Sequence, residues 1–241
     1  MDYLIRVAAA RGDGRVYAGT RGNWGPNYRV GYVPVLHELS HNDADGVGFT
    51  FRTVQSLSTD VEASFDETNP AQFEALNIRY VLMPNSRKPA VPATLLSSKG
   101  SNNLYEVDTS GYFQVVDRIG VLKADRTNLV DANNRFWASK SALDNIYPAV
   151  AFAGHQPPPS AFASAPAGSP GSVLTESNAR ENGRFSARVN AERSATVLLK
   201  SSYDPRWHVT VDGRTAHPIM MAPSLVGVDV PVGEHSIVFT Y

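Results

Sequence analysis

The sequence predicts an α+β fold, with a small N-terminal α/β unit over residues 1–125 and an antiparallel β-sandwich, jelly-roll or immunoglobulin-like, over residues 145–241. In the C-terminal half, apolar residues alternate with polar ones, which is the periodicity of half-buried strands. The alternating valines are Val209 and Val211 in one segment and Val226, Val228 and Val230 in another. The dipeptide Asp212-Gly213 is favoured in two-residue hairpin turns, because both residues need positive φ. Upstream, helix and strand signals are mixed, which is typical of an α/β unit.

Composition indicates an ordinary folded chain of one large or two medium domains. The 241 residues are 42% hydrophobic and 19% charged, with a net charge of −1. This charge gives no general attraction to nucleic acid. The absence of cysteine excludes disulfides, thiolate metal ligands and cysteine nucleophiles. There is no apolar run long enough to span a bilayer and no visible signal peptide, and residues 1–10 are interpreted as the end of a helix entering from a longer protein.

The N-terminal elements are expected to be short and to alternate in type. Residues 14–19 read as a strand and residues 21–28 as a loop with two aromatic side chains. Residues 28–41 have helical apolar spacing that Pro34 interrupts. A strand at 48–53 and a helix capped by Ser58 or Thr59 follow.

The clearest helix start in this half is Asn69-Pro70, an N-cap followed by proline at the first helical position. It leads directly into an apolar strand at 78–83. Two more strands are predicted at 103–107 and 112–117, around a turn at 108–111.

The second half begins with a segment at 131–137 that is polar and reads as turn-rich. A strand follows at 146–152, and Pro148 favours an edge position for it. Residues 156–171 form a Pro/Ala/Ser-rich loop with little apolar surface to bury. Further strands are expected at 184–189 and 196–201.

Trp207 is expected in the core of the C-terminal unit. Strand alternation places it on one face with Val209 and Val211. Leu198 and Phe239 are the predicted packing partners.

One segment superficially matches a zinc-hydrolase motif. His37, Glu38 and His41 reproduce the His-Glu-x-x-His pattern, in which two imidazoles bind zinc and the glutamate acts as general base. The zinc-hydrolase version lies in a long regular helix, whereas here Pro34 precedes the motif and turn residues follow it. A surface helix end is therefore the preferred interpretation, and no metal or cofactor is predicted.

Three stretches resemble a known family. They are FEALNIRYVLM at 73–83, NLYEV at 103–107 followed by YFQVV, and VLLKSSYDPRWHVTVDG at 197–213, which continues into 228–241. Together they are similar to the extracytoplasmic C-terminal part of YfhO-like, GT-C-type bacterial polytopic membrane glycosyltransferases. Arg206 departs from the pattern, since the family usually has glycine before the tryptophan.

The resemblance implies a non-catalytic domain on the extracytoplasmic face of the bacterial cell membrane. Its expected partners are the membrane-embedded part of the parent protein and a cell-envelope glycan, and no nucleic acid. The family's catalytic residues lie in a loop that this chain does not contain. No nucleophile elbow, phosphate loop or dinucleotide motif is present either, so no catalytic residue is predicted.

The alternative from another class is a stand-alone β-sandwich carbohydrate-binding module. Such modules stack exposed aromatic rings on the apolar faces of sugars. The candidate platforms are Trp24, Tyr28, Trp137 and Tyr203. A zinc hydrolase using His37, Glu38 and His41 is the second alternative.

Overall fold

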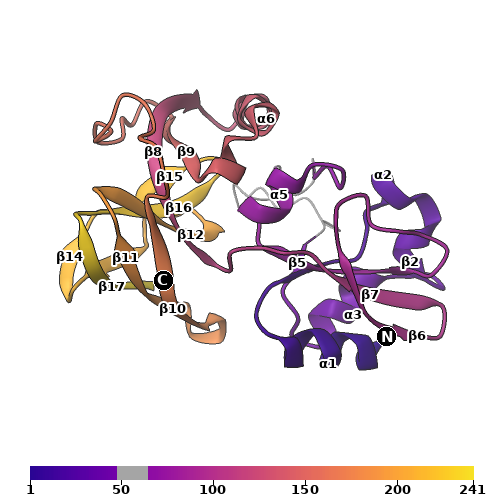
Figure 1. Cartoon of the computed structure of the whole chain (residues 1–241). Coiled ribbons are helices and arrows are strands. Elements are labelled where there is room, and N and C mark those ends of the chain that lie inside the picture. Colours follow the sequence, from indigo (N-terminus) through magenta and orange to yellow (C-terminus); the bar gives the residue numbers. More distant parts are fainter. Residues whose placement is uncertain (48–64) are drawn as a thin grey trace. The chain divides into compact units, whose positions relative to one another are not determined.

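The computed structural model describes residues 1–47 and 65–241 (Figure 1), which form two compact units. The first unit comprises residues 1–47 and 65–111, and the second comprises residues 112–241. The units therefore divide between Gly111 and Tyr112, whereas the sequence interpretation extended the first unit to residue 125. The strand predicted at 48–53 and the helix predicted after Ser58 or Thr59 lie outside the described residues.

The first unit has a mixed sheet with strand order β4-β1-β5-β7-β6. Strand β1 runs parallel to β4 and β5, whereas β7 is antiparallel to β5 and β6. Its strands are β1 (Arg15–Tyr17), β4 (Gly46–Val47), β5 (Ile78–Pro84), β6 (Thr94–Lys99) and β7 (Asn102–Glu106), with a separate hairpin of β2 (Arg29–Val30) and β3 (Val33–Pro34). Its helices are α1 (Asp2–Arg11), α2 (Arg21–Trp24), the 3₁₀ helix η1 (Gly25–Tyr28), α3 (Val35–His41) and α5 (Pro70–Ala75).

Apolar side chains cover both faces of this sheet. Helices α1 and α3 contribute Leu4, Ile5 and Leu39 to a core with Val16 and Leu82 of the strands. A separate aromatic cluster contains Tyr17, Trp24, Phe65 and Phe73. The Tyr17 ring contacts those of Trp24 and Phe65, and the Phe65 ring contacts that of Phe73, with centroid distances of 4.8–5.3 Å. Alternation along β1 sends Val16 and Tyr17 to these two different clusters.

Two local expectations in this unit have clear outcomes. The Asn69-Pro70 start is confirmed, because the Asn69 side chain accepts a hydrogen bond from Ala71 N at 3.0 Å. The helix expected over 28–41 begins only at Val35. The residues before it form the β2–β3 hairpin, in which Gly31 takes a φ of 61° at the turn.

The second unit is rich in strands, as the sequence predicts, and has two sheets (Figure 1). An open antiparallel sheet has the order β10-β11-β17-β13-β14, and a closed barrel has the order β12-β16-β15-β9-β8. The open-sheet strands are β10 (Gly171–Ala179), β11 (Arg184–Ala191), β13 (His208–Val211), β14 (Arg214–Ala216) and β17 (Gly233–Thr240). The barrel strands are β8 (Phe113–Ala124), β9 (Ile146–Phe152), β12 (Ala195–Ser202), β15 (Ile219–Met221) and β16 (Leu225–Val230). The remaining elements are α6 (Leu129–Ser139) and the 3₁₀ helices η2 (Ser141–Asp144) and η3 (Arg180–Asn182).

The barrel contains a feature that the sequence interpretation missed. Strands β8 and β9 pair in parallel, and parallel neighbours need a crossover connection, usually a helix. Here α6 provides it, so the interpretation of 131–137 as turn-rich was wrong. Its buried residues recur at helical spacing, namely Leu129, Ala132, Asn133, Phe136 and Trp137.

The core of the second unit lies between the barrel and the open sheet, and Trp207 is buried in it. The indole contacts Phe185, Phe239 and Tyr241 edge-to-face, at centroid distances of 6.0, 6.1 and 5.3 Å. Its Nε1 donates a hydrogen bond to Ser202 O at 2.9 Å. Phe239 is thus confirmed as a partner, but Leu198 is not part of this core, because alternation along β12 directs Val197 and Leu199 towards it instead.

The segment 197–213 contains two turns whose backbone conformation accounts for the residues found there. The Asp212-Gly213 turn is confirmed as a two-residue hairpin, with φ of 52° and 76° and Val211 paired to Arg214. Arg206 has no positive φ, so its position does not require glycine. Its guanidinium bonds both carboxylate oxygens of Asp204 at 3.0 Å and lies 4.9 Å from the Tyr241 ring centroid.

Candidate functional site

Two of the four predicted aromatic platforms are buried. Trp24 contacts the Tyr17 ring edge-to-face, and its Nε1 donates to the Glu67 carboxylate. Trp137 packs beside Phe136 on α6, at a centroid distance of 4.9 Å. Neither indole presents a ring face to solvent, so the interpretation of these two as sugar platforms is corrected. Large aromatic side chains bury enough area to stabilise a core, and this favours their burial here.

The other two predicted platforms are partly exposed and belong to different units. Tyr28 ends η1, and the guanidinium of Arg29 lies 4.8 Å from its ring centroid. Tyr203 packs against the core of the second unit, and burial raises the pKa of its hydroxyl.

The zinc-like motif lies on the seven-residue helix α3, which ends at His41. His37 and His41 are both exposed. Within residues 1–47 and 65–241, no group of three or more histidine, aspartate or glutamate side chains is placed to hold a metal ion.

The Pro-rich loop, defined here as residues 156–170 between β9 and β10, is held at its first end by Arg118 of β8. Arg118 donates from Nη1 to Pro158 O at 2.6 Å and from Nη2 to Pro159 O at 3.0 Å. The same guanidinium pairs with both carboxylate oxygens of Asp229 on β16, at 3.3 and 2.6 Å. The side chain of Arg118 is buried.

Arg193 holds the other end of the loop. It donates to four successive carbonyls, those of Pro166, Ala167, Gly168 and Ser169, at 2.8–3.3 Å. It also pairs bidentately with Asp117 of β8, whose side chain is only 2% exposed, at 3.0 and 2.7 Å. The hydrogen bonds to the Asp117 carboxylate raise the pKa of Arg193.

The two arginines suit a proline-rich partner for a simple chemical reason. Proline has no backbone N–H, so the prolines of this loop offer only carbonyl acceptors. Arginine is a pure donor with five N–H groups in a fixed fork. The segment that the sequence predicted as a surface loop is thereby fixed against the barrel at both ends.

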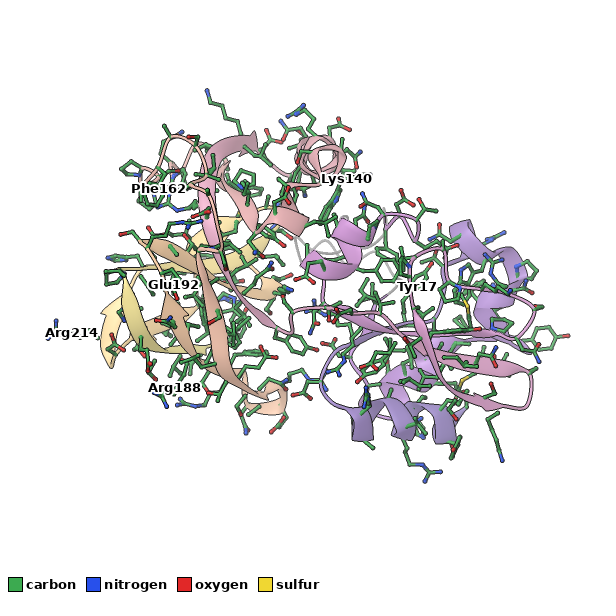
Figure 2. The ribbon with its side chains drawn as sticks, viewed as in Figure 1. Tyr17, Lys140, Phe162, Arg188, Glu192 and Arg214 are labelled. Carbon is green, nitrogen blue, oxygen red and sulfur yellow. The ribbon has the colours of Figure 1, made fainter. Side chains whose placement is uncertain are left out.

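A groove lies between this loop and the barrel, with a volume of about 350 Å³. We call it the loop groove. Its walls are Pro159, Ala161 and Phe162 of the loop, residues 194–196 leading into β12, and residues 229–231 at the end of β16, with Arg118 completing the lining. Figure 2 labels Phe162 on the loop, at the margin of the second unit.

The loop groove combines an aromatic ring with hydroxyl and carboxylate groups. Phe162 is half-buried, and the Asp229 side chain is 46% exposed. Thr196 Oγ1 donates to Asp229 Oδ1 at 2.7 Å, and the Ser194 hydroxyl lies in the same wall. Among the lining residues the charges of Arg118 and Asp229 cancel, so the surface offers hydrogen bonding without net charge.

Sequence reasoning missed this groove because its parts are distant in the chain. Arg118 and Asp229 are 111 positions apart, and Phe162 lies in a low-complexity segment. The available signal was Asp229 itself, a carboxylate between Val228 and Val230 on the outward side of a strongly alternating strand.

In the described ranges, no helix is both long and apolar enough to cross a bilayer. Family models, curated proteins and solved structures contain no match to this chain. The residues of the loop groove and the resemblance of the sequence are therefore the observations that bear on function.

Proposed function

We propose that this chain is a non-catalytic extracytoplasmic domain of a GT-C-type membrane glycosyltransferase-like protein, and that its loop groove binds a neutral cell-envelope saccharide. The observation that carries the proposal is that the half-buried Phe162 ring and the exposed Asp229 carboxylate line one groove without net charge. In this proposal, the barrel and the open sheet of the second unit act as the two layers of a β-sandwich-type binding module.

Sugars need both kinds of group that the groove supplies. A pyranose has apolar C–H faces that pack on aromatic rings, and hydroxyls at its edge that need hydrogen-bond partners. A carboxylate is an acceptor-only group, and hydrogen bonds to an ionised acceptor are stronger than those between neutral groups. The groove volume of about 350 Å³ falls in the range of small-ligand pockets, about 300–1,000 Å³.

The charge balance favours a neutral ligand over a phosphate or an amine. Arg118 donates to Asp229, Pro158 and Pro159, so its positive charge is compensated and its fork is largely occupied. Asp229 is compensated by the same contact. A phosphate would meet the carboxylate and an ammonium group would meet the guanidinium, and both juxtapositions are repulsive.

The expected parent and location rest on the family-like stretches. Trp207 packs in the core of the second unit. This packing agrees with a family motif that stabilises the fold and contains no catalytic residue. In the proposal, the membrane-embedded part of the parent performs the transfer reaction on the extracytoplasmic face, and this domain positions the glycan acceptor.

A stand-alone carbohydrate-binding module is the second candidate, and the same groove would serve it. The full-length reading frame separates the two: membrane-spanning helices upstream of Met1 support the first, and a signal peptide alone supports the second. The zinc hydrolase gains no support from the exposed histidines of α3.

The test is calorimetric titration of the chain with neutral hexose oligosaccharides, with sugar phosphates and choline as charged comparisons. We expect binding of a neutral oligosaccharide only. Phe162→Ala should weaken it about fivefold or more, because a stacked ring contributes roughly 1 kcal/mol or more.

Tyr32→Ala is the matched control, since it removes an exposed aromatic ring from the first unit. It should leave the affinity unchanged. Failure of every neutral saccharide to bind would remove the glycan function. Binding that survives Phe162→Ala would keep the function and move the site elsewhere.

A further inference from the structure

The β2–β3 hairpin of the first unit has an exposed apolar tip. Val30 and Val33 face each other across the two short strands, with Gly31 and Tyr32 at the turn. Their side chains are unusually open to solvent: Val30 is 51% exposed, Tyr32 95% and Val33 44%. Figure 1 shows β2 near α2 in this unit.

Nothing within the described residues explains this exposure. The hairpin is a separate two-stranded sheet that is not hydrogen-bonded to the five-stranded sheet. A two-stranded hairpin gains little stability of its own in water. Exposed apolar side chains gathered in one place are typical of an interaction surface.

The charges around the tip indicate what it contacts. Residues 14–37 contain Arg15, Arg21 and Arg29 and no aspartate or glutamate, although the whole chain has a net charge of −1. Arg15 is paired with Asp45, whereas Arg21 and Arg29 are exposed. Arg29 directly precedes Val30 in β2, and Arg21 lies on α2 of the same unit. A partner of the tip should therefore combine an apolar interior with an anionic surface.

We propose that this tip inserts into the headgroup layer of an anionic lipid bilayer. Val30, Tyr32 and Val33 would reach the boundary with the acyl chains, a region that suits tyrosine because its ring is apolar and its hydroxyl is polar. Arg21 and Arg29 would contact lipid phosphates, their apolar stems lying along the tip. The inference does not depend on saccharide binding.

Binding of the chain to a bilayer through one hairpin tip is weak, so the experiment must be able to detect low affinity. Three side chains bury little area, and stable attachment to membranes usually takes more than one signal. In a membrane-anchored parent, tethering would supply a high effective concentration. The isolated chain should therefore be tested over a wide range of lipid concentrations.

The test is flotation of the full chain with vesicles of phosphatidylcholine alone or mixed with phosphatidylglycerol. We expect flotation with the anionic vesicles, weakened by salt because exposed charges are screened. The double variant Tyr32→Ser with Val33→Ser should lower the bound fraction about fivefold or more, and Arg21→Gln with Arg29→Gln should lower it on anionic vesicles. Because all four positions are solvent-exposed, thermal melts should stay unchanged.

Leu174→Ser, which changes an exposed apolar side chain of the second unit, is the control and should float like the wild type. The proposal is overturned if the wild-type chain stays in the soluble fraction at every lipid concentration, or if the serine variant floats equally well. Concentration-dependent dimerisation that the serine variant abolishes, without vesicle binding, would assign the tip to a second copy of the chain.

Discussion

Trp207→Ala is expected to lower the free energy of unfolding of the second unit by about 3–5 kcal/mol, the range for emptying a large buried aromatic site. The indole fills the core between barrel and open sheet, where it contacts Phe185, Phe239 and Tyr241. Urea denaturation followed by far-ultraviolet circular dichroism measures the change. The chain has two compact units, so two unfolding transitions are possible. Where both are resolved, only the transition of the second unit should shift to lower urea concentration.

Trp207→Phe serves as the control for this core. It keeps an aromatic ring but removes the hydrogen bond to Ser202 O, so its cost should be clearly smaller. Wild-type stability in Trp207→Ala would show that the ring is not a core element, and would return it to the group of sugar-binding candidates.

Arg193→Ala is expected to destabilise the second unit by about 3–5 kcal/mol, because it leaves a buried carboxylate without its partner. Asp117 is 2% exposed and receives two hydrogen bonds from Arg193. The substitution also removes the donors to residues 166–169, so the Pro-rich loop loses one of its two fixed ends. Saccharide affinity should fall with it, since the loop forms one wall of the groove.

Arg188→Ala is the matched comparison for this prediction. Its pair with Glu234 is exposed on both sides, so the loss should be at most about 1 kcal/mol. Equal effects of the two substitutions would contradict the assigned role of Arg193. Adding Asp117→Asn to Arg193→Ala should recover part of the stability, because the uncompensated charge is then removed.

Predictions from the sequence succeeded where the signal was local. The Asp212-Gly213 turn depends on two adjacent residues, and β16 follows from the alternation of Val226, Val228 and Val230. Helix α6 was missed because its middle, residues 131–135, is polar apart from Ala132, and its buried stripe includes Asn133. The barrel was missed because its closure depends on pairing between distant strands.

The candidate site could not be predicted from local sequence patterns either, because it also depends on contacts between residues that are distant in the chain. Aromatic identity alone does not distinguish a sugar platform from a core residue, and Trp24 and Trp137 are buried. The loop groove depends instead on long-range contacts, chiefly those of Arg118 with the loop and with Asp229. No spacing in the sequence connects these residues.

The central claim, that the loop groove binds a neutral saccharide, is tested most directly by mapping backbone amide chemical shifts during titration with a neutral oligosaccharide. We predict saturable changes concentrated at Ala161 and Phe162, at residues 194–196 and at Asp229 and Val230, with unchanged resonances at Tyr28. Saturable changes centred on Tyr28 or Tyr203, with the loop groove silent, would contradict the assignment of the site.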